Sequence, residues 1–130
     1  MADGDQTIVK TSDNRAKINS TENEDVWEIV ITSTFDADDD SAVSLAIPLN
    51  GILRHVTVTL PLTTTTGTTS QILIKDNGDN TVLDTGEIAE NATHNFVIDI
   101  PLSGTIDVSL EPSAASGDAV TTSTITLRGV

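Results

Sequence analysis

The chain contains two histidines, His55 and His94, and histidine is the side chain most often used for proton transfer near neutral pH. A histidine base needs a nucleophile or a carboxylate within hydrogen-bond reach. The neighbours of His55 are instead Thr57 and Thr59 in an alternating stretch, a pattern typical of an exposed strand face. The sequence also lacks the motifs of serine hydrolases, zinc proteases, phosphate-binding loops and dinucleotide-binding domains. We therefore expect no catalytic residues, no cofactor and no enzymatic activity.

Three aspartates are spaced for metal chemistry: Asp36, Asp38 and Asp40. Hard cations such as Ca²⁺ bind clustered carboxylate oxygens, and these residues have the first three ligand spacings of an EF-hand loop. The glycine position of that loop is Ser41 here and its bidentate acid position is Ile47, so an EF-hand is excluded. A calcium site in this loop, alone or shared with Asp76 and Asp79, is one hypothesis. A solvated acidic loop is the preferred interpretation.

Two similar segments of the sequence are predicted to form turns between strands. Residues 47–51 read Ile-Pro-Leu-Asn-Gly, and residues 100–104 read Ile-Pro-Leu-Ser-Gly. Proline fixes its own φ and lacks an N–H, whereas glycine tolerates a positive φ, so each segment can turn the chain sharply. An apolar stretch suited to a strand lies on each side of both segments. The repeated unit is strand, corner, strand, as in a jelly roll built from two Greek keys.

The composition favours an all-β fold. About one residue in six is threonine, which with valine and isoleucine suits the half-buried surface of a sheet. The stretches that suit strands lie at 26–35, 43–47, 52–60, 71–75, 81–84, 96–100, 105–110 and 120–128. None has helical periodicity, and turn signals separate them, including Asn77-Gly78, whose positions tolerate a positive φ. We predict a two-sheet β-sandwich of a jelly-roll-like type over residues 26–130.

Alternation within the strands predicts which side chains face the core. In 52–60, Val56 and Val58 lie on the apolar face, whereas Leu53 falls on the opposite face with His55. The same reasoning in each strand gives the expected core: Trp27, Ile29, Ile31, Val56, Val58, Ile72, Ile74, Phe96, Ile98 and Ile106.

The charge of the chain excludes two classes of partner. Twenty acidic residues against six basic ones give a net charge of −14. Nucleic-acid binding depends on lysine and arginine that neutralise phosphates, so we expect neither nucleic acid nor an anionic membrane as a partner.

The chain has no cysteine, which excludes disulfides and thiolate chemistry. Its first residues, MADGDQ, lack the basic and apolar regions of a signal peptide, so we expect synthesis without secretion.

Residues 1–25 are polar, and we predict that they form an extended N-terminal arm. Their strand-like run is 6–10, which contains Ile8 and Val9. Two interpretations remain open. The arm is either partly disordered or paired at a sheet edge, or it reaches a neighbouring subunit with Ile8 and Val9 as its partner-binding anchor.

Four segments between 36 and 130 carry a resemblance to a known family: VSLAIPLNGILRHVTVTLPL, ILIKDNGDNTVLD, IPLSGTIDVSL and TSTITLRGV. They resemble the small virion proteins of tailed bacteriophages that decorate or cement the capsid. Members of that family are β-sandwich or jelly-roll modules, often trimeric, that bridge neighbouring major capsid proteins on the outside of the shell. The resemblance implies a non-enzymatic homotrimer whose partner is the major capsid protein. It also implies synthesis in the host cytoplasm and a final location on the outer capsid surface of the virion.

Two other classes of function remain. A tail-fibre or receptor-binding module would also be an all-β trimer, but it would bind host-surface glycans in isolation. A hydrolase or lectin-like domain is the third choice. Glycan-binding sandwiches usually present exposed aromatic platforms, and the three aromatic residues of this chain, Trp27, Phe35 and Phe96, all occupy expected core positions.

Overall fold

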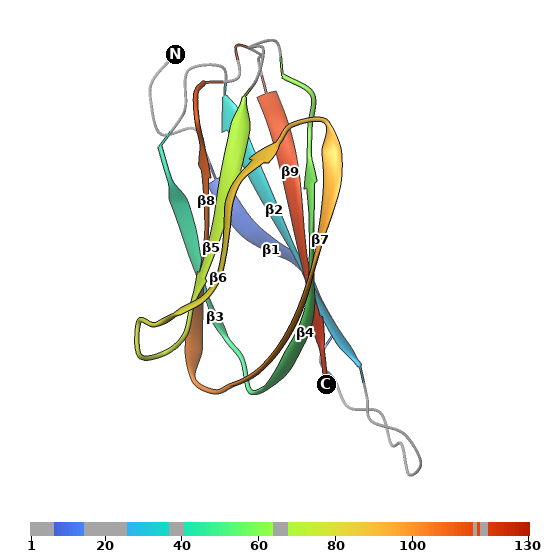
Figure 1. Ribbon diagram of the computed structural model, residues 1–130, viewed down its shortest axis with the longest axis vertical. Helices are drawn as coiled ribbons and strands as arrows, with labels where there is room; N and C mark the ends of the chain where they lie inside the picture. The colour runs from blue at the N-terminus through green and yellow to red at the C-terminus, as the bar shows by residue number, and fades with distance from the viewer. Residues whose placement is uncertain (1–6, 15–25, 37–40, 64–67, 116, 118–119) are drawn as a thin grey trace.

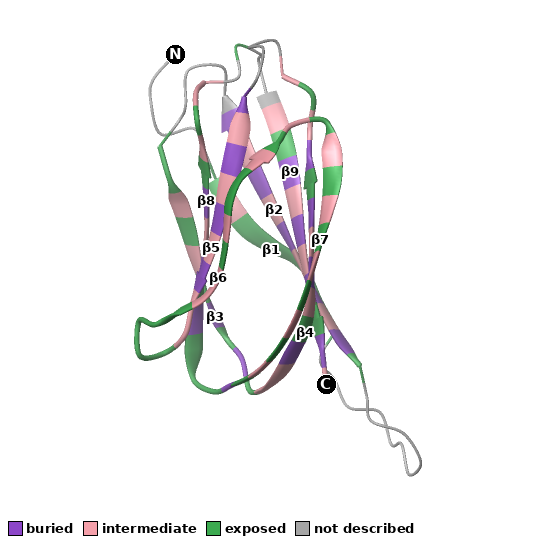
Figure 2. Ribbon diagram, in the orientation of Figure 1, coloured by how far each residue is buried: buried purple, intermediate pink, exposed green. Residues whose placement is uncertain are grey.

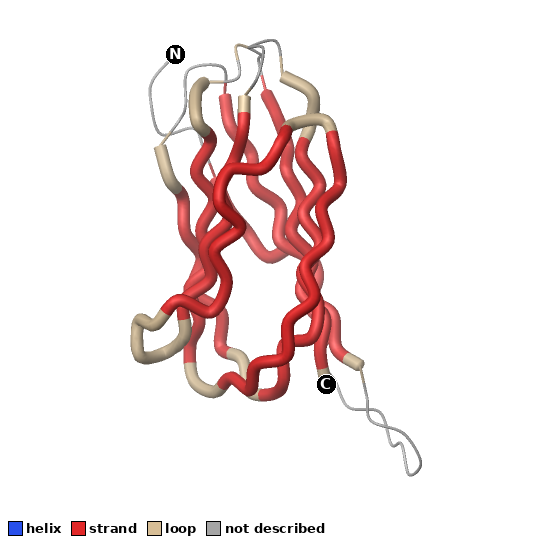
Figure 3. The backbone as a smooth tube through the Cα atoms, viewed as in Figure 1, coloured by secondary structure: helices blue, strands red, loops and turns tan. Residues whose placement is uncertain are grey.

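Nine β-strands make up the described part of the chain in this computed structural model (Figures 1 and 3). The structure describes residues 7–14, 26–36, 41–63, 68–115, 117 and 120–130. The strands are β1 (Thr7–Asn14), β2 (Trp27–Asp36), β3 (Val43–Pro48), β4 (Gly51–Leu60), β5 (Thr69–Lys75), β6 (Thr81–Ala89), β7 (Ala92–Leu102), β8 (Thr105–Pro112) and β9 (Val120–Gly129). None of the described residues forms a helix, and so none contributes a membrane-spanning helix. The all-β prediction is confirmed.

The strands form two antiparallel sheets that pack face to face (Figure 1). Sheet A has the order β1-β2-β9-β4-β7, and sheet B has the order β3-β8-β5-β6. Apart from β1, these orders are those of an eight-stranded jelly roll. Strand β1 extends sheet A at its edge, beside β2. The two-sheet sandwich predicted from the sequence is confirmed.

The two Ile-Pro-Leu corners lie side by side where the chain crosses between the sheets. Residues 47–51 lead from β3 to β4, and residues 100–104 lead from β7 to β8. The N–H of Leu49 donates to the carbonyl oxygen of Gly104 over 2.8 Å. The two corner glycines have φ values of +148° at Gly51 and +86° at Gly104, as the motif predicts. The repeated motif is therefore a pair of crossovers, hydrogen-bonded to each other, that joins the two sheets.

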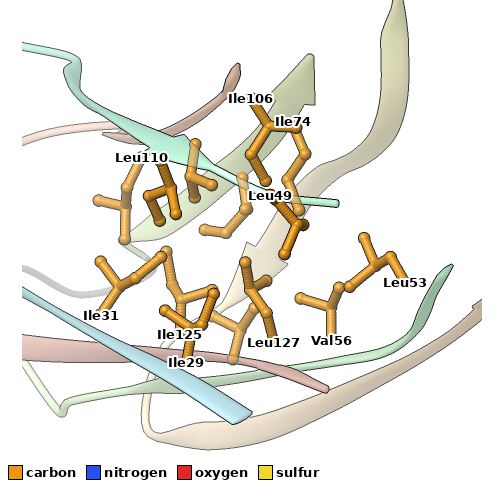
Figure 4. Packing of buried hydrophobic residues seen from close by; sticks show 14 of the residues in the cluster. Ile29, Ile31, Leu49, Leu53, Val56, Ile74, Ile106, Leu110, Ile125 and Leu127 are labelled. Carbon is orange, nitrogen blue, oxygen red and sulfur yellow. The ribbon is translucent and has the colours of Figure 1, made fainter. Parts of the chain in front are cut away.

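The core lies between the sheets and is built from aliphatic side chains of both (Figures 2 and 4). Eight of the expected core residues are buried: Trp27, Ile29, Ile31, Val56, Val58, Ile72, Ile74 and Ile106. Phe96 and Ile98 are only partly buried, so full burial was the wrong prediction for these two. Both pack against the core from β7, but β7 is the last strand of sheet A, and no described strand pairs with its outer side.

The predicted face of Leu53 was wrong, because the strand register shifts next to this residue. Leu53 is fully buried, although simple alternation places it opposite Val56. The pairing of β4 with both β7 and β9 slips between Leu53 and His55, which is the mark of a β-bulge. The extra residue reverses the alternation, so Leu53 and Val56 both face the core.

The turn between β5 and β6 also differs from the prediction. The residue with a positive φ is Asp79, at 65°, and neither Asn77 nor Gly78 takes that conformation. The carboxylate of Asp76 accepts hydrogen bonds of 2.9 Å from the N–H groups of Gly78 and Asn80. A longer turn, organised by the Asp76 side chain, therefore replaces a two-residue Asn-Gly turn.

Candidate interaction surfaces

Among the described residues, the aspartates considered as calcium ligands do not form a cluster. Asp36 ends β2, whereas Asp38 and Asp40 lie outside the described residues. Asp76 is engaged in its own turn, and Asp79 lies 3.5 Å from the ammonium group of Lys75. In the part of the chain that the structure describes, no three acidic, histidine or cysteine side chains are grouped to hold a metal ion. Calcium binding at Asp36, Asp38 and Asp40 stays a prediction.

Both histidines hydrogen-bond to neutral groups. His55 Nδ1 lies 3.2 Å from the hydroxyl of Thr57, and His94 Nε2 lies 2.8 Å from the carbonyl oxygen of Ala89. His94 Nε2 must carry a proton to donate to that carbonyl. These contacts hold the rings on the sheet surface, as the alternating pattern predicts for His55. They resemble the contacts of structural histidines rather than those of a general base beside a nucleophile.

Ile8 and Val9, the proposed anchor of the arm, lie in β1. Ile8 pairs with Ser33 and packs partly against the core, whereas Val9 pairs with Thr32 and is 49% exposed. The other residues of β1 are exposed. The strand therefore depends mainly on backbone hydrogen bonds to β2, and these bonds are available equally to a strand of another copy. Contact with a neighbouring subunit stays a prediction.

The outer face of sheet A is an ordered array of threonines, which we call the threonine face. Its members are Thr32 and Thr34 of β2, Thr57 and Thr59 of β4, Thr93 of β7, and Thr122, Thr124 and Thr126 of β9. One row crosses four strands in register, from Thr93 through Thr59 and Thr124 to Thr32. The hydroxyls of Thr59 and Thr93 lie 3.2 Å apart, within hydrogen-bond distance. The threonine side chains are short, whereas a second row on the same side of the sheet, formed by Val97, His55, Arg128 and Glu28, carries longer groups across the same four strands.

The charged side chains around the threonine face are paired within the chain. Arg128 Nε lies 2.8 Å from Glu28 Oε2 across β9 and β2. Arg54 lies 3.3 Å from Asp99 at the bulge. Lys10 lies 2.6 Å from Asp13 in β1. The paired groups are at least partly exposed to solvent, so the pairs contribute little to stability, but they leave the face close to neutral.

The outer face of sheet B is acidic, and we call it the acidic face. It carries Asp84 and Glu87 on β6 and Asp107 and Glu111 on β8, with Lys75 on β5 between them. Hydrogen bonds from the Gly86 N–H and the Gln71 amide lower the pKa of Asp84, so this carboxylate remains ionised near neutral pH. Glu87 and Glu111 line an open depression of about 530 Å³. The two sheets therefore present surfaces of different charge.

A small cavity lies at one end of the sandwich. Its volume is about 30 Å³, and the hydroxyl residues Thr68, Ser70 and Ser123 line it together with Phe35 and Leu60. This space suits a water molecule and is far smaller than the ~300 Å³ of a typical small-molecule site. The faces of the sheets are therefore better candidates for function than this cavity.

The comparisons with known proteins support the fold of this chain but do not identify its function. No protein-family model matches the sequence, and no curated protein does. A chain from the acidic stable capsid structure of Helicobacter pylori bacteriophage KHP30 has a TM-score of 0.52 at 12% identity, covering 96% of this chain and 93% of that chain. The carbohydrate-binding module TmCBM61, solved with β-1,4-galactotriose, has a TM-score of 0.47 at 13% identity, covering 95% and 87%. The mitogen of Yersinia pseudotuberculosis has a TM-score of 0.45 at 8% identity, covering 75% and 83%. The shared property is a β-sandwich fold.

Proposed function

We propose that this protein is a non-enzymatic virion structural protein that decorates and cements a bacteriophage capsid. It binds the outer surface of the major capsid protein lattice, and it acts as a homotrimer. The observation that supports this most is the fold match to a chain of the KHP30 capsid structure, which extends over nearly the whole of both chains. The family resemblance of residues 36–130 points to the same function.

The physical properties of the molecule suit such a role. A sandwich that closes around a continuous aliphatic core is a rigid body with two broad sheet faces. A net charge of −14 disfavours binding to nucleic acid and would complement a basic surface on a partner protein. Each trimer presents three copies of every weak contact to a repeating lattice, and the effective concentration of linked sites multiplies their affinity.

The arm supplies a second type of contact in this proposal. Strand β1 has little buried side-chain surface, so its pairing with β2 can be exchanged for pairing with an edge strand of a neighbour at small cost. Ile8 and Val9 are the apolar residues that such pairing would place against the partner.

A glycan-binding module is the main alternative, and the aromatic side chains argue against it. Trp27 and Phe35 are 5% and 4% exposed, and Phe96 packs partly against the core. These are the only aromatic residues in the sequence, so sugar rings would lack an aromatic platform for stacking.

The test is binding to capsid shells that lack the decoration protein. Purified protein is mixed with such shells and sedimented, and the bound fraction is measured over a range of protein concentrations. Saturable binding that raises the temperature at which the shells fall apart is expected. Absence of binding to shells, together with binding to host-surface glycans, would transfer the assignment to the receptor-binding class.

A further inference from the structure

We infer that Asn50 and Asn77 are deamidation sites, and that contacts with the corner at residues 103–105 suppress the reaction at both sites while the protein is folded. Each of these asparagines is followed by glycine, and they form the two Asn-Gly dipeptides of the sequence. Asparagine is a thermolabile residue, and a following glycine, which has no side chain, leaves its own nitrogen unobstructed. The inference is independent of the proposed function, because the chemistry takes place within one chain.

Deamidation is a reaction between an asparagine side chain and the backbone of the next residue. At Asn77, the nitrogen of Gly78 loses its proton and forms a bond to Cγ, while the side-chain nitrogen Nδ2 takes up a proton and leaves as ammonia. Water then opens the resulting succinimide ring at either carbonyl carbon, which gives aspartate or isoaspartate. The ring closes only after rotation about the bonds that separate Cγ from the attacking nitrogen. Any contact that opposes this rotation therefore slows the reaction.

The same corner holds both asparagine side chains. Asn50 and Asn77 are exposed residues, so access of water alone predicts that both react. The N–H of Gly104, however, donates to Asn50 Oδ1 over 3.2 Å, and the N–H of Thr105 donates to Asn77 Oδ1 over 3.3 Å. Two consecutive backbone donors thus fix amides that lie far apart in the sequence. Rotation of either side chain toward its glycine breaks one of these hydrogen bonds.

At Asn77, both reacting groups are held. A methyl group on Gly104 would lie 2.7 Å from Asn77 Cγ, so the asparagine side chain packs directly on the glycine backbone. The N–H of Gly78, which must lose its proton, donates to the Asp76 carboxylate over 2.9 Å. A second negative charge that develops beside this carboxylate is disfavoured by repulsion. The turn therefore opposes both formation of the nucleophile and its approach to Cγ.

At Asn50, the backbone is held on both sides. The N–H of Leu49 donates to the carbonyl oxygen of Gly104 over 2.8 Å. Gly51 begins β4 and is tightly enclosed, because a Cβ atom there would lie 2.6 Å from the carbonyl oxygen of Val130. The peptide that would supply the attacking nitrogen therefore has little room to rotate. Deamidation at either site requires local opening of the corner, so its rate measures that opening.

The experiment compares the folded protein with synthetic peptides that span each Asn-Gly dipeptide. All samples are kept in the same mildly alkaline buffer, which favours loss of the backbone proton. Mass spectrometry follows the deamidated fraction with time, and a trypsin digest places Asn50 and Asn77 on separate fragments because Arg54 and Lys75 lie between them. We expect each site to react at least about tenfold more slowly in the protein than in its peptide, which corresponds to ~1.4 kcal/mol.

One variant releases the nucleophile at a single site. Asp76→Ala removes the hydrogen bond to the Gly78 N–H and is expected to accelerate deamidation of Asn77 about fivefold, with no change at Asn50. Asp84→Ala is the matched control, because the Asp84 carboxylate also accepts a 2.9 Å hydrogen bond from the N–H of a glycine two residues further along. This control should leave the rate at Asn77 unchanged.

A second variant displaces the asparagine side chain. Gly104→Ala places a methyl group where Asn77 Cγ now lies, so it is expected to accelerate deamidation of Asn77. Gly86→Ala is its control, because Gly86 also has a positive φ but a methyl group there meets nothing within 4 Å. Circular dichroism checks that every variant is folded, and Asp76→Ala tests the inference if Gly104→Ala is not.

Two results would overturn the inference. The first is an asparagine that reacts as fast in the folded protein as in its peptide. The second is a loss of site dependence: equal acceleration of Asn77 by Asp76→Ala and Asp84→Ala, or equal acceleration of Asn50 and Asn77 by Asp76→Ala. Global unfolding, rather than the contacts of the corner and the turn, would then control the modification.

Discussion

The indole ring of Trp27 occupies the space that a side chain at Gly129 would need. A methyl group at Gly129 would overlap the six-membered part of that ring and the carbonyl oxygen of Ile52. Trp27 and Gly129 are opposite each other in the β2–β9 pairing, so the ring packs over the glycine. This contact ties the largest side chain of the core to the strand at the centre of sheet A.

Gly129→Ala is therefore expected to destabilise the fold by ~1–3 kcal/mol, the usual cost of overpacking. The measurement is the urea midpoint at constant slope. Gly86→Ala is the control, because a methyl group there meets nothing within 4 Å and the only cost is its φ of +63°. That cost is expected to be ~1 kcal/mol. If both variants lower the free energy of unfolding by the same amount, the Trp27 side chain must move aside without added strain.

The paired corners give a second prediction. Leu49 and Leu102 are 1% and 7% exposed and occupy the same position in the two motif copies. Leu49→Ala and Leu102→Ala should each lower the free energy of unfolding by ~2–5 kcal/mol, because each leaves a cavity in the core. Leu62→Ala is the control, and a change within about 0.5 kcal/mol is expected for this exposed side chain. A small loss at position 49 or 102 would mean that the corner collapses to fill the space.

The role of β1 can be tested by deleting residues 1–20. Because Ile8 alone in this strand packs against the core, the thermal midpoint of the sandwich should change little. Attachment to shells should weaken, since the exchanged strand is lost. A truncated protein that melts several degrees lower and still attaches fully would make β1 an ordinary edge strand.

A disulfide across β1 and β2 reports directly on strand exchange. The chain has no cysteine, and Val9 and Thr32 are paired across the strands. In the variant Val9→Cys with Thr32→Cys, exchange between copies should give covalent multimers on a non-reducing gel. Pairing within each copy gives a band at the monomer mass and contradicts exchange.

Asp76 gives a pH-dependent prediction. Hydrogen bonds from Asn80 and Gly78 lower the pKa of this carboxyl group in the folded state. A lowered folded-state pKa means that the ionised group contributes stability above the unfolded value of about 3.9, and that this contribution is lost as the pH falls through the lower folded value. Asp76→Asn should thus destabilise the protein at pH 7 and have less effect in acid. Urea unfolding at both pH values checks this, with Asp79→Asn as a control in the same turn.

Local features of the fold could be predicted from the sequence, but features that depend on which strands are neighbours could not. The burial of Trp27, Ile29 and Ile31 follows from alternation within β2 alone. The reversal at Leu53 requires the pairing of β4 with two strands on either side. The partial exposure of Phe96 depends on its strand being last in the sheet.

The same distinction applies to the candidate surfaces. The alternating threonines of β4 and β9 are visible in the sequence, yet their alignment into rows depends on pairing between distant segments. The pair Glu28–Arg128 joins residues 100 positions apart. Local sequence patterns therefore could not predict that one sheet face is neutral and the other acidic.

The central position of β9 has a consequence for how the protein folds. This strand pairs with β2 on one side and β4 on the other, and both are made earlier during translation. Until residues 120–129 leave the ribosome, β2 and β4 have no shared neighbour, and the Trp27 ring lacks Gly129 to pack on. Pairings between such distant segments form slowly, because loop entropy is lost before the contacts are gained. We therefore expect the nascent chain to remain protease-sensitive until β9 emerges and then to fold in one cooperative step.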